Sequence, residues 1–122
     1  MIIDLNKIPL GVAESQRELL MLRAGKLVSE IKKIKSDFNY IVMSVNILNI
    51  IEHSDQFMTR SAQQLDDLFF VGEVLDMKVY VDVLMDPNMM SIRYDIQNTR
   101  DIKIQQLLGG KPKKDSIEIT IL

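Results

Sequence analysis

The stretch FFVGEVLDMKVYVDVLMDPNMMSIRYD, residues 69–95, decides the fold class of this chain. Three segments rich in β-branched and aromatic residues are separated by Asp76-Met77 and by a proline-containing turn at 85–88. The middle segment alternates, with Val79, Val81 and Val83 facing one way and Lys78, Tyr80 and Asp82 the other. Alternation of this kind is typical of a strand with one face on a core and one toward solvent. The stretch therefore predicts a meander of antiparallel strands.

The other segments of the β region carry signals of their own. Gly72 stands inside the first strand, where a glycine often marks a bulge or the close approach of another backbone. The third segment places Met90, Ile92 and Tyr94 on one face and Met89, Ser91 and Arg93 on the other. After a predicted loop at 109–115, the sequence SIEITIL at 116–122 indicates a last strand with Ile117, Ile119 and Ile121 on one side.

A long amphipathic helix is predicted over residues 15–35. Ser15 and Glu18 have the spacing of a capping box. The apolar positions that follow have helical spacing and are Leu20, Ala24, Leu27, Ile31 and Ile34. Gly25 costs about 1 kcal/mol relative to alanine in a helix, so we expect a close neighbour or a kink there. We expect the apolar face to pack on the sheet, although it could also bind a partner helix.

The segment between this helix and the meander predicts a buried strand and a short helix. The apolar run NYIVMS at 39–44 fits a central strand that is buried on both faces. Ser44 is placed to cap a helix over 45–53, with Val45, Leu48 and Ile51 facing inward. The polar residues 52–67 indicate an exposed loop.

These elements define the expected fold class and domain organisation. We predict a single α+β domain over residues 15–122, with an antiparallel or mixed sheet and two flanking helices, preceded by an extended segment at 1–14. The chain has 122 residues, of which 47% are hydrophobic and 26% charged, as expected for a protein with one core. No apolar run approaches the roughly 20 residues of a membrane-spanning helix, so we expect no membrane association.

The charge distribution disfavours nucleic-acid binding. The net charge is −2, and the basic residues form only two short groups, Lys32, Lys33 and Lys35 and then Lys111, Lys113 and Lys114. Nucleic-acid binders usually concentrate positive charge on one surface. Basic residues at the end of a helix are favoured by the helix dipole whatever the function.

Residues for catalysis or metal binding are sparse in the sequence. His53 is the only histidine, there is no cysteine, and the aspartates lack the spacing of a calcium loop. No nucleophile elbow, phosphate-binding loop or dinucleotide-binding motif occurs. We therefore expect no enzymatic activity, no cofactor, no metal and no small-molecule substrate.

Several phrases of the sequence occur together in one protein family. They follow the predicted long helix in the order NYIVMS at 39–44, SDQF at 54–57, VGEVLDMKVYVD at 71–82 and IRY at 92–94. In this order they resemble the C-terminal portion of the major capsid proteins of tailed bacteriophages, particularly the T-even-like branch. The chain departs from the family at Val83, where a proline is expected, and at Arg93, where a glycine is expected.

The resemblance implies a non-enzymatic structural protein. Capsid subunits of this family are several times longer, and the chain would correspond to their axial domain, which lines the centre of a capsomer. Its partners would then be copies of itself or other virion and capsid proteins, and it would be made in the host cytoplasm and end in the virion. A small adaptor or regulatory protein, for example a modulator of capsid assembly that binds through the helix at 15–35, is the alternative.

The resemblance also places the assembly contacts in two loops. The axial domain meets its neighbours through loops near the capsomer centre, which correspond by position to residues 54–68 and 84–90 of this chain. The candidate contact residues are Phe57, Met58, Leu65, Asp66, Met85, Met89 and Met90. Methionines at a turn could provide an adaptable contact surface.

Overall fold

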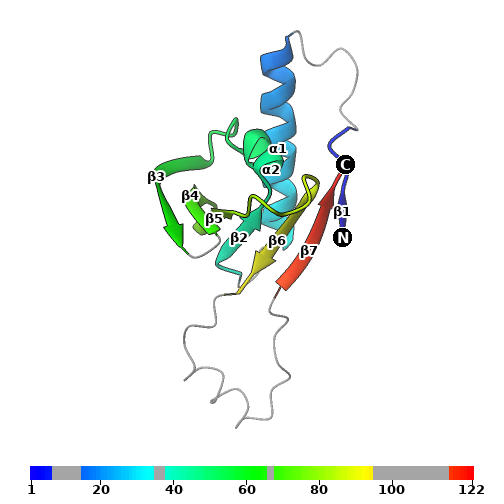
Figure 1. The fold of residues 1–122 in the computed structure, drawn as a ribbon. Helices are drawn as coiled ribbons and strands as arrows, with labels where there is room; N and C mark the ends of the chain where they lie inside the picture. Colours follow the sequence, from blue (N-terminus) through cyan, green and yellow to red (C-terminus); the bar gives the residue numbers. More distant parts are fainter. Residues whose placement is uncertain (7–14, 35–37, 66–67, 95–115) are drawn as a thin grey trace.

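One seven-stranded mixed sheet with two helices forms the described part of the chain (Figure 1). The computed structural model describes residues 1–6, 15–34, 38–65, 68–94 and 116–122. The predicted loop at 109–115, Asp66 and three basic residues, Lys111, Lys113 and Lys114, lie outside these ranges, as does Lys35. The predicted α+β class is confirmed.

The sheet has the strand order β1-β7-β6-β2-β5-β4-β3. The strands are β1 (Ile2–Ile3), β2 (Tyr40–Met43), β3 (Phe57–Leu65), β4 (Leu68–Val74), β5 (Met77–Val81), β6 (Met89–Arg93) and β7 (Ser116–Ile121). Two neighbouring pairs, β1–β7 and β2–β5, are parallel, and the other four are antiparallel.

Strand β2 occupies the centre of the sheet, as predicted. It lies between β6 and β5, so the predicted meander is wrong for its last strand: β5 and β6 are not neighbours, and β5 pairs parallel with β2. Residues Ile41, Val42 and Met43 of β2 are all buried. Because neighbouring residues of a strand point to opposite faces, both faces of β2 are covered. On the face opposite Ile41 and Met43, the rings of Tyr40 and Tyr80 pack edge to face with centroids 5.8 Å apart.

Helix α1 spans Gln16–Ile34 and follows the predicted capping. The Glu18 amide donates to Ser15 Oγ at 3.2 Å, which satisfies one of the free N–H groups at the helix start. The buried residues of α1 are Ala24, Leu27, Val28 and Ile31. The expected close neighbour of Gly25 is absent, since a Cβ added there would meet no atom within 4 Å.

Helix α2 spans Val45–Ile51, and Ser44 caps it through Oγ, which accepts from the Ile47 amide at 3.1 Å. The predicted helix and its predicted cap Ser44 are confirmed, but the prediction that Val45 faces inward is wrong. The helix buries Ile47, Ile50 and Ile51, whose spacing defines one face, and Val45 lies two residues before that face begins. Its side chain is 46% exposed.

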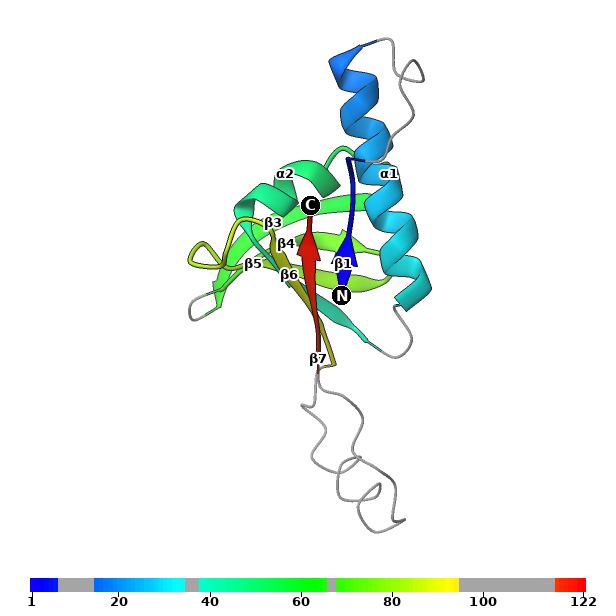
Figure 2. The ribbon, with the colours of Figure 1, turned by 90° about the vertical axis from the view of Figure 1, so that its right-hand side faces the viewer.

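The two helices cover one face of the sheet and enclose a single core. In Figure 2 both lie on the same side of the strands, and the N-terminal part of α1 projects beyond the sheet. The buried residues of the core come from both helices and from every strand except β3. They include Leu27, Ile47, Ile41, Val79, Ile92 and Ile119. The N-terminal residues contribute Ile3 and Leu5, so the beginning of the chain belongs to the same core.

The predicted loop over 52–67 is wrong for most of its length, because residues 57–65 form strand β3, which pairs antiparallel with β4. The strand lies at the edge of the sheet, and the side chains from Met58 to Gln64 are exposed. An exposed edge strand has no need of apolar side chains, so its composition is that of a loop.

Both predictions for Gly72 in β4, a bulge and the close approach of another backbone, are confirmed. The pairing of β4 with β5 shifts register between Phe70 and Gly72, which is the mark of a bulge. A Cβ on Gly72 would collide with the backbone oxygen of Met58 and lie 2.7 Å from the ring of Phe57. The glycine therefore lets β3 pass close to β4.

The hairpin between β4 and β5 turns at Leu75 and Asp76, one residue earlier than predicted. Both residues have positive φ, 50° and 63°, as a two-residue hairpin turn with the right-handed twist of its strands requires. Met77 therefore begins β5 and is fully buried. Strand β5 ends at Val81, so the prediction that Val83 continues its buried face is wrong.

Candidate functional site

The connection between β5 and β6 exposes aliphatic side chains to solvent. Leu84, at its tip, is 88% exposed, and its neighbour Val83 is also exposed. Val45, at the start of α2, adds a third exposed aliphatic residue beside the same connection. Single exposed apolar residues are common, but several gathered in one place mark an interaction site.

Hydrogen bonds within residues 82–89 fix the conformation of this connection. The Leu84 amide donates to Asp82 Oδ1 at 3.0 Å, and the Asn88 amide donates to Asp86 Oδ1 at 3.0 Å. Two backbone bonds, from Met85 N to Asp82 O at 3.2 Å and from Met89 N to Asp86 O at 3.0 Å, close the same two turns. Aspartate favours such turns because its side chain bonds to the backbone two residues later.

Helix α2 anchors the connection to the body of the domain. Ser44 Oγ donates to the Pro87 carbonyl at 2.7 Å, and Asn46 Nδ2 donates to the same oxygen at 3.4 Å. The Ser44 amide also donates to the carbonyl of Met89 at 3.3 Å. The residue that caps α2 therefore also holds the end of the connection.

A hollow of about 460 Å³ lies between the connection and α2. It is lined by Ser44, Val45, Asn46, Asn49, Val83, Met85 and Pro87. We call the apolar residues Val45, Val83, Leu84, Met85 and Pro87 the Leu84 surface. Asp82 and Asp86 flank its tip, so the surface is apolar with an acidic border.

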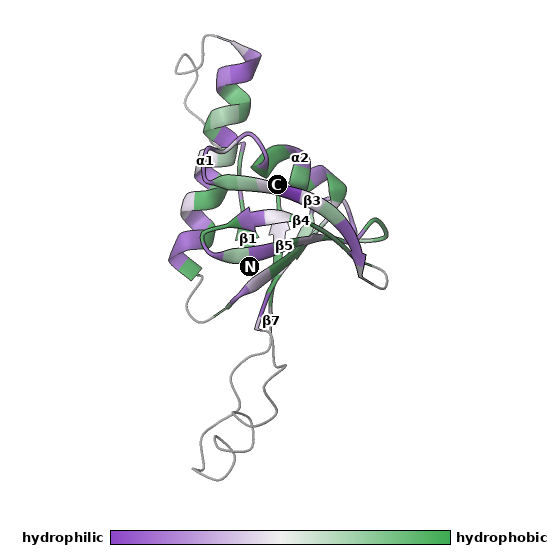
Figure 3. Ribbon diagram, turned by 90° about the vertical axis from the view of Figure 1, so that its left-hand side faces the viewer, coloured by the Kyte–Doolittle hydropathy of each residue, from purple (hydrophilic) through white to green (hydrophobic). Residues whose placement is uncertain are grey.

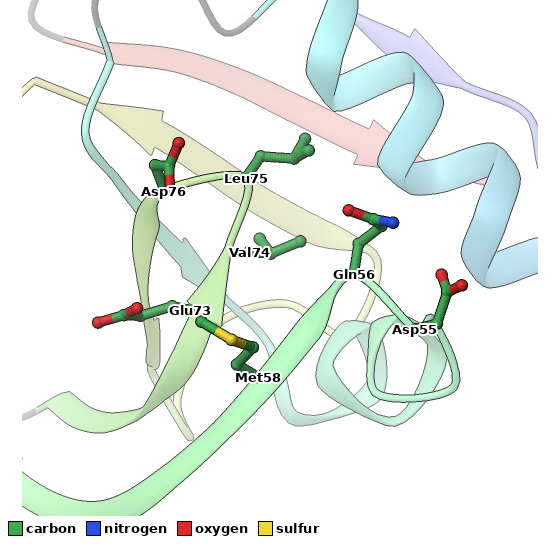
Figure 4. A pocket seen from close by; sticks show the side chains of 7 residues that line it. All are labelled: Asp55, Gln56, Met58, Glu73, Val74, Leu75 and Asp76. Atoms are coloured by element: carbon green, nitrogen blue, oxygen red, sulfur yellow. The ribbon is translucent and has the colours of Figure 1, made fainter.

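A second hollow, of about 310 Å³, lies beside the β4–β5 hairpin (Figure 4). Its lining residues are Asp55, Gln56, Met58, Glu73, Val74, Leu75 and Asp76. Figure 4 shows the three carboxylates pointing in different directions rather than toward a common centre. Glu73 already contacts Arg60, with 3.6 Å between Oε2 and Nη2. Within the described ranges no group of three or more acidic, histidine or cysteine residues could hold a metal ion.

The candidate contact residues of 54–68 are only partly available. Phe57 is half-buried and packs against the core, whereas Met58 is 50% exposed and lines the second hollow. Leu65 ends β3, and its side chain, like the whole of Asp66, lies outside the described structure.

The three methionines of the second predicted contact region have different positions. Met85 is half-buried and lines the hollow beside α2, and Met89 is half-buried at the start of β6. Met90 is fully buried, because it faces the core from the second position of β6. Met90 is therefore a core residue and not a surface contact.

The sequence interpretation missed Val45 and Val83, and it included Leu84 in the predicted contact region 84–90 without naming it as a contact residue. The alternation KVYVDVL assigned Val83 to the buried face of β5, and Val45 was assigned to the buried face of α2. The pair Val83-Leu84 directly before MDPN was the available signal, because two large aliphatic residues beside a turn are candidates for exposure.

The remaining candidates for chemistry lie apart from both hollows. His53 is exposed just after α2, and Lys33 forms an exposed ion pair with Glu30 at 3.2 Å. Neither helix of the described chain is long and apolar enough to cross a membrane.

Comparisons with protein-family models, with curated proteins and with solved structures give no match for this chain. The resemblance to phage capsid proteins therefore rests on the ordered phrases between residues 39 and 94, together with the helix before them.

Proposed function

We propose that this chain is a non-enzymatic structural protein of a tailed-phage head, which acts through protein–protein contacts. Its place would be the virion, after synthesis in the host cytoplasm. The observation that supports this proposal most directly is Leu84, an aliphatic side chain held almost entirely in solvent by an ordered connection. Its partners would be proteins, either copies of itself or other components of the head.

The ordered conformation of residues 82–88 makes Leu84 suited to binding. Association loses free energy when flexible loops must be immobilised, and a segment already fixed by hydrogen bonds avoids that cost. Full burial of a leucine side chain contributes about 1.5–3 kcal/mol. Val83 precedes Leu84 in the chain and lines the hollow together with Val45, so a partner that covers the hollow and its edge would cover all three.

The assignment to a phage head draws on the resemblance and on the position of the matching phrases. The phrases at 39–44, 71–82 and 92–94 contribute β2, part of β4, β5 and β6, which are neighbours in the order β6-β2-β5-β4. The similarity thus lies in one contiguous part of the fold rather than in scattered segments. This supports the axial-domain interpretation.

The test is to add the purified protein to an assembling major capsid protein of the T-even type. Co-sedimentation with the shells is measured, and negative-stain imaging records any change in the particles. We expect the wild-type protein to sediment with the shells or to alter them, and Leu84→Asp to lose this effect. A protein that neither sediments with the shells nor changes them contradicts the proposal.

Leu122→Asp provides the matched control, because Leu122 is a leucine that directly follows β7 and is 52% exposed. Circular dichroism and thermal unfolding should be unchanged in both variants, since neither side chain is in the core. If Leu122→Asp abolishes the effect as fully as Leu84→Asp, the Leu84 surface is not the contact.

The adaptor function through α1 remains the second candidate, with a different surface. Leu27 and Ile31, on the predicted binding face, are fully buried in the core of the domain and are not accessible to a partner. The exposed residues Leu19, Met21 and Leu22 favour partner binding through the N-terminal half of the helix instead.

A further inference from the structure

We propose that the Leu84 surface of one molecule binds the outer face of α1 in a second copy of this chain. We define the outer face by Leu19, Leu22, Arg23 and Lys26. The inference rests on the proposed assembly function and names both the partner and the two surfaces that meet. The contact is head to tail, because the two surfaces are different.

The four residues of the outer face lie on one side of α1. Their spacing of i, i+3, i+4 and i+7 brings their side chains together on one side of α1, which borders the buried face because Arg23 lies one turn before Leu27. Leu19 and Leu22 are 39% and 38% exposed. Leucines on the solvent side of a helix give it apolar residues on both faces, which is typical of a helix that is covered on both.

The two leucines of the outer face, Leu19 and Leu22, also lie on the part of α1 that precedes its buried residues. Every buried residue of α1 is at Ala24 or later, so the first two turns have no buried side chain. Figure 3 shows hydrophobic residues on this projecting part of the helix and on the β5–β6 connection at the other side of the molecule. Each of the two apolar areas is thus open to a partner.

The two surfaces have opposite charge. The outer face contains Arg23 and Lys26, a charge of +2, whereas residues 82–88 contain two aspartates and no basic residue, a charge of −2. Arg23 and Lys26 make no ion pair among the described residues. An apolar tip with an acidic border therefore matches an apolar pair with basic neighbours.

Like charge disfavours the two symmetric alternatives. A two-fold contact between Leu84 surfaces would bring Asp82 and Asp86 of both molecules together, which places four carboxylates in one interface. A two-fold contact between outer faces would bring the basic residues of two helices together. Only the unlike pairing joins leucine to leucine and acid to base.

The positions of the two surfaces determine what the contact builds. The β5–β6 connection and α1 lie on opposite sides of the molecule (Figures 2 and 3). A head-to-tail pair keeps one free Leu84 surface on one molecule and one free outer face on the other, so further copies can add. Such a contact gives a ring if its rotation closes and a filament if it does not.

The test uses the asymmetry of the contact and is made by sedimentation velocity on the full chain over a concentration series. We expect the wild-type protein to form species larger than a dimer as its concentration rises. Leu84→Asp and Leu22→Asp should each remain monomeric when alone. An equimolar mixture of the two should form a heterodimer and nothing larger, because only one intact Leu84 surface and one intact outer face remain to pair.

The possible outcomes separate this inference from other contacts. Assembly of Leu22→Asp at wild-type level, or a mixture that stays monomeric, overturns it. A wild-type protein that is monomeric at every concentration also overturns it, whereas co-sedimentation with capsid shells would still support the proposed function. Leu122→Asp should assemble like the wild type, and unchanged circular dichroism should confirm that the variants are folded.

Discussion

Ser44 shows how one small side chain can shape both the core and the surface. Its Oγ accepts from the Ile47 amide and so starts α2, and the same hydroxyl donates to the carbonyl of Pro87. The first bond orients the helix that buries Ile47 and Ile51, and the second fixes the connection that exposes Leu84. A hydroxyl can do both because it donates one hydrogen bond and accepts others.

At the scale of single residues, alanine substitution of two glycines should change the stability of the protein in opposite directions. Gly72→Ala should lower the free energy of unfolding by about 1–3 kcal/mol, because the new methyl group would meet the Met58 carbonyl and the Phe57 ring. Both groups belong to β3, so the added methyl group would push this strand away from β4. Urea unfolding followed by circular dichroism measures the change.

Gly25→Ala is the matched control, since it makes the same chemical change in α1 where a Cβ meets no atom within 4 Å. It should raise the free energy of unfolding by about 0.5–1 kcal/mol, because alanine loses less backbone freedom than glycine on forming a helix. Equal effects of the two substitutions would contradict the close approach of β3 to Gly72.

At the scale of the element, the two faces of α1 should respond differently to truncation. Leu27→Ala should lower the free energy of unfolding by about 2–5 kcal/mol, because Leu27 is fully buried and the change leaves a cavity. Leu22→Ala, on the outer face, should change it by no more than about 0.5 kcal/mol. Chemical denaturation of both variants tests the assignment of the two faces.

A loss of stability in Leu22→Ala as large as in Leu27→Ala would mean that the outer face is covered within the molecule. If both variants instead remain stable, α1 does not contribute to the core as the structure indicates.

The strands illustrate how far the sequence can be interpreted at this scale. The alternation in SIEITIL gave the correct position of β7, and that in KVYVDVL located β5 but extended it three residues beyond its end at Val81, because each strand has one face on the core. Strand β3 escaped detection because every side chain from Met58 to Gln64 is exposed. An edge strand is held by backbone hydrogen bonds to its neighbour, which leave no periodic mark in the sequence.

At the scale of the whole molecule, the opposite charges of the two proposed surfaces predict that self-association depends on salt. Raising NaCl from about 0.1 M to about 1 M shortens the Debye length from about 10 Å to about 3 Å and screens the attraction between them. We expect the dissociation constant to rise about fivefold, because two exposed ion pairs of about 0.5 kcal/mol each together contribute about 1 kcal/mol. Sedimentation at the two salt concentrations measures it.

Sodium sulfate at equal ionic strength separates the two components of this contact. Sulfate strengthens the burial of apolar surface while it screens charge, so the loss of affinity should be smaller than in NaCl. Association that is stronger in high NaCl than in low NaCl would contradict the contribution of Asp82 and Asp86.

The sequence by itself determined the local structure of most described elements. Caps and apolar patterns placed α1, α2, β2, β6 and β7 to within about two residues, because these signals arise from neighbours along the chain. The glycine at 72 was correctly interpreted for the same reason, since its effect on the strand is local. The α+β class followed from the order of these elements.

Only the tertiary structure decided which side chains of the connection are exposed. The pairing of β5 with β2 ends where Val81 meets Met43, so nothing covers Val83 although it continues the alternation. Met90, in contrast, is buried because β6 carries it under the helices. Burial depends on where a neighbouring strand ends, and that neighbour comes from a segment more than thirty residues away in the chain. Local sequence patterns do not show where such a distant strand ends, so the candidate site could be identified only in the folded chain.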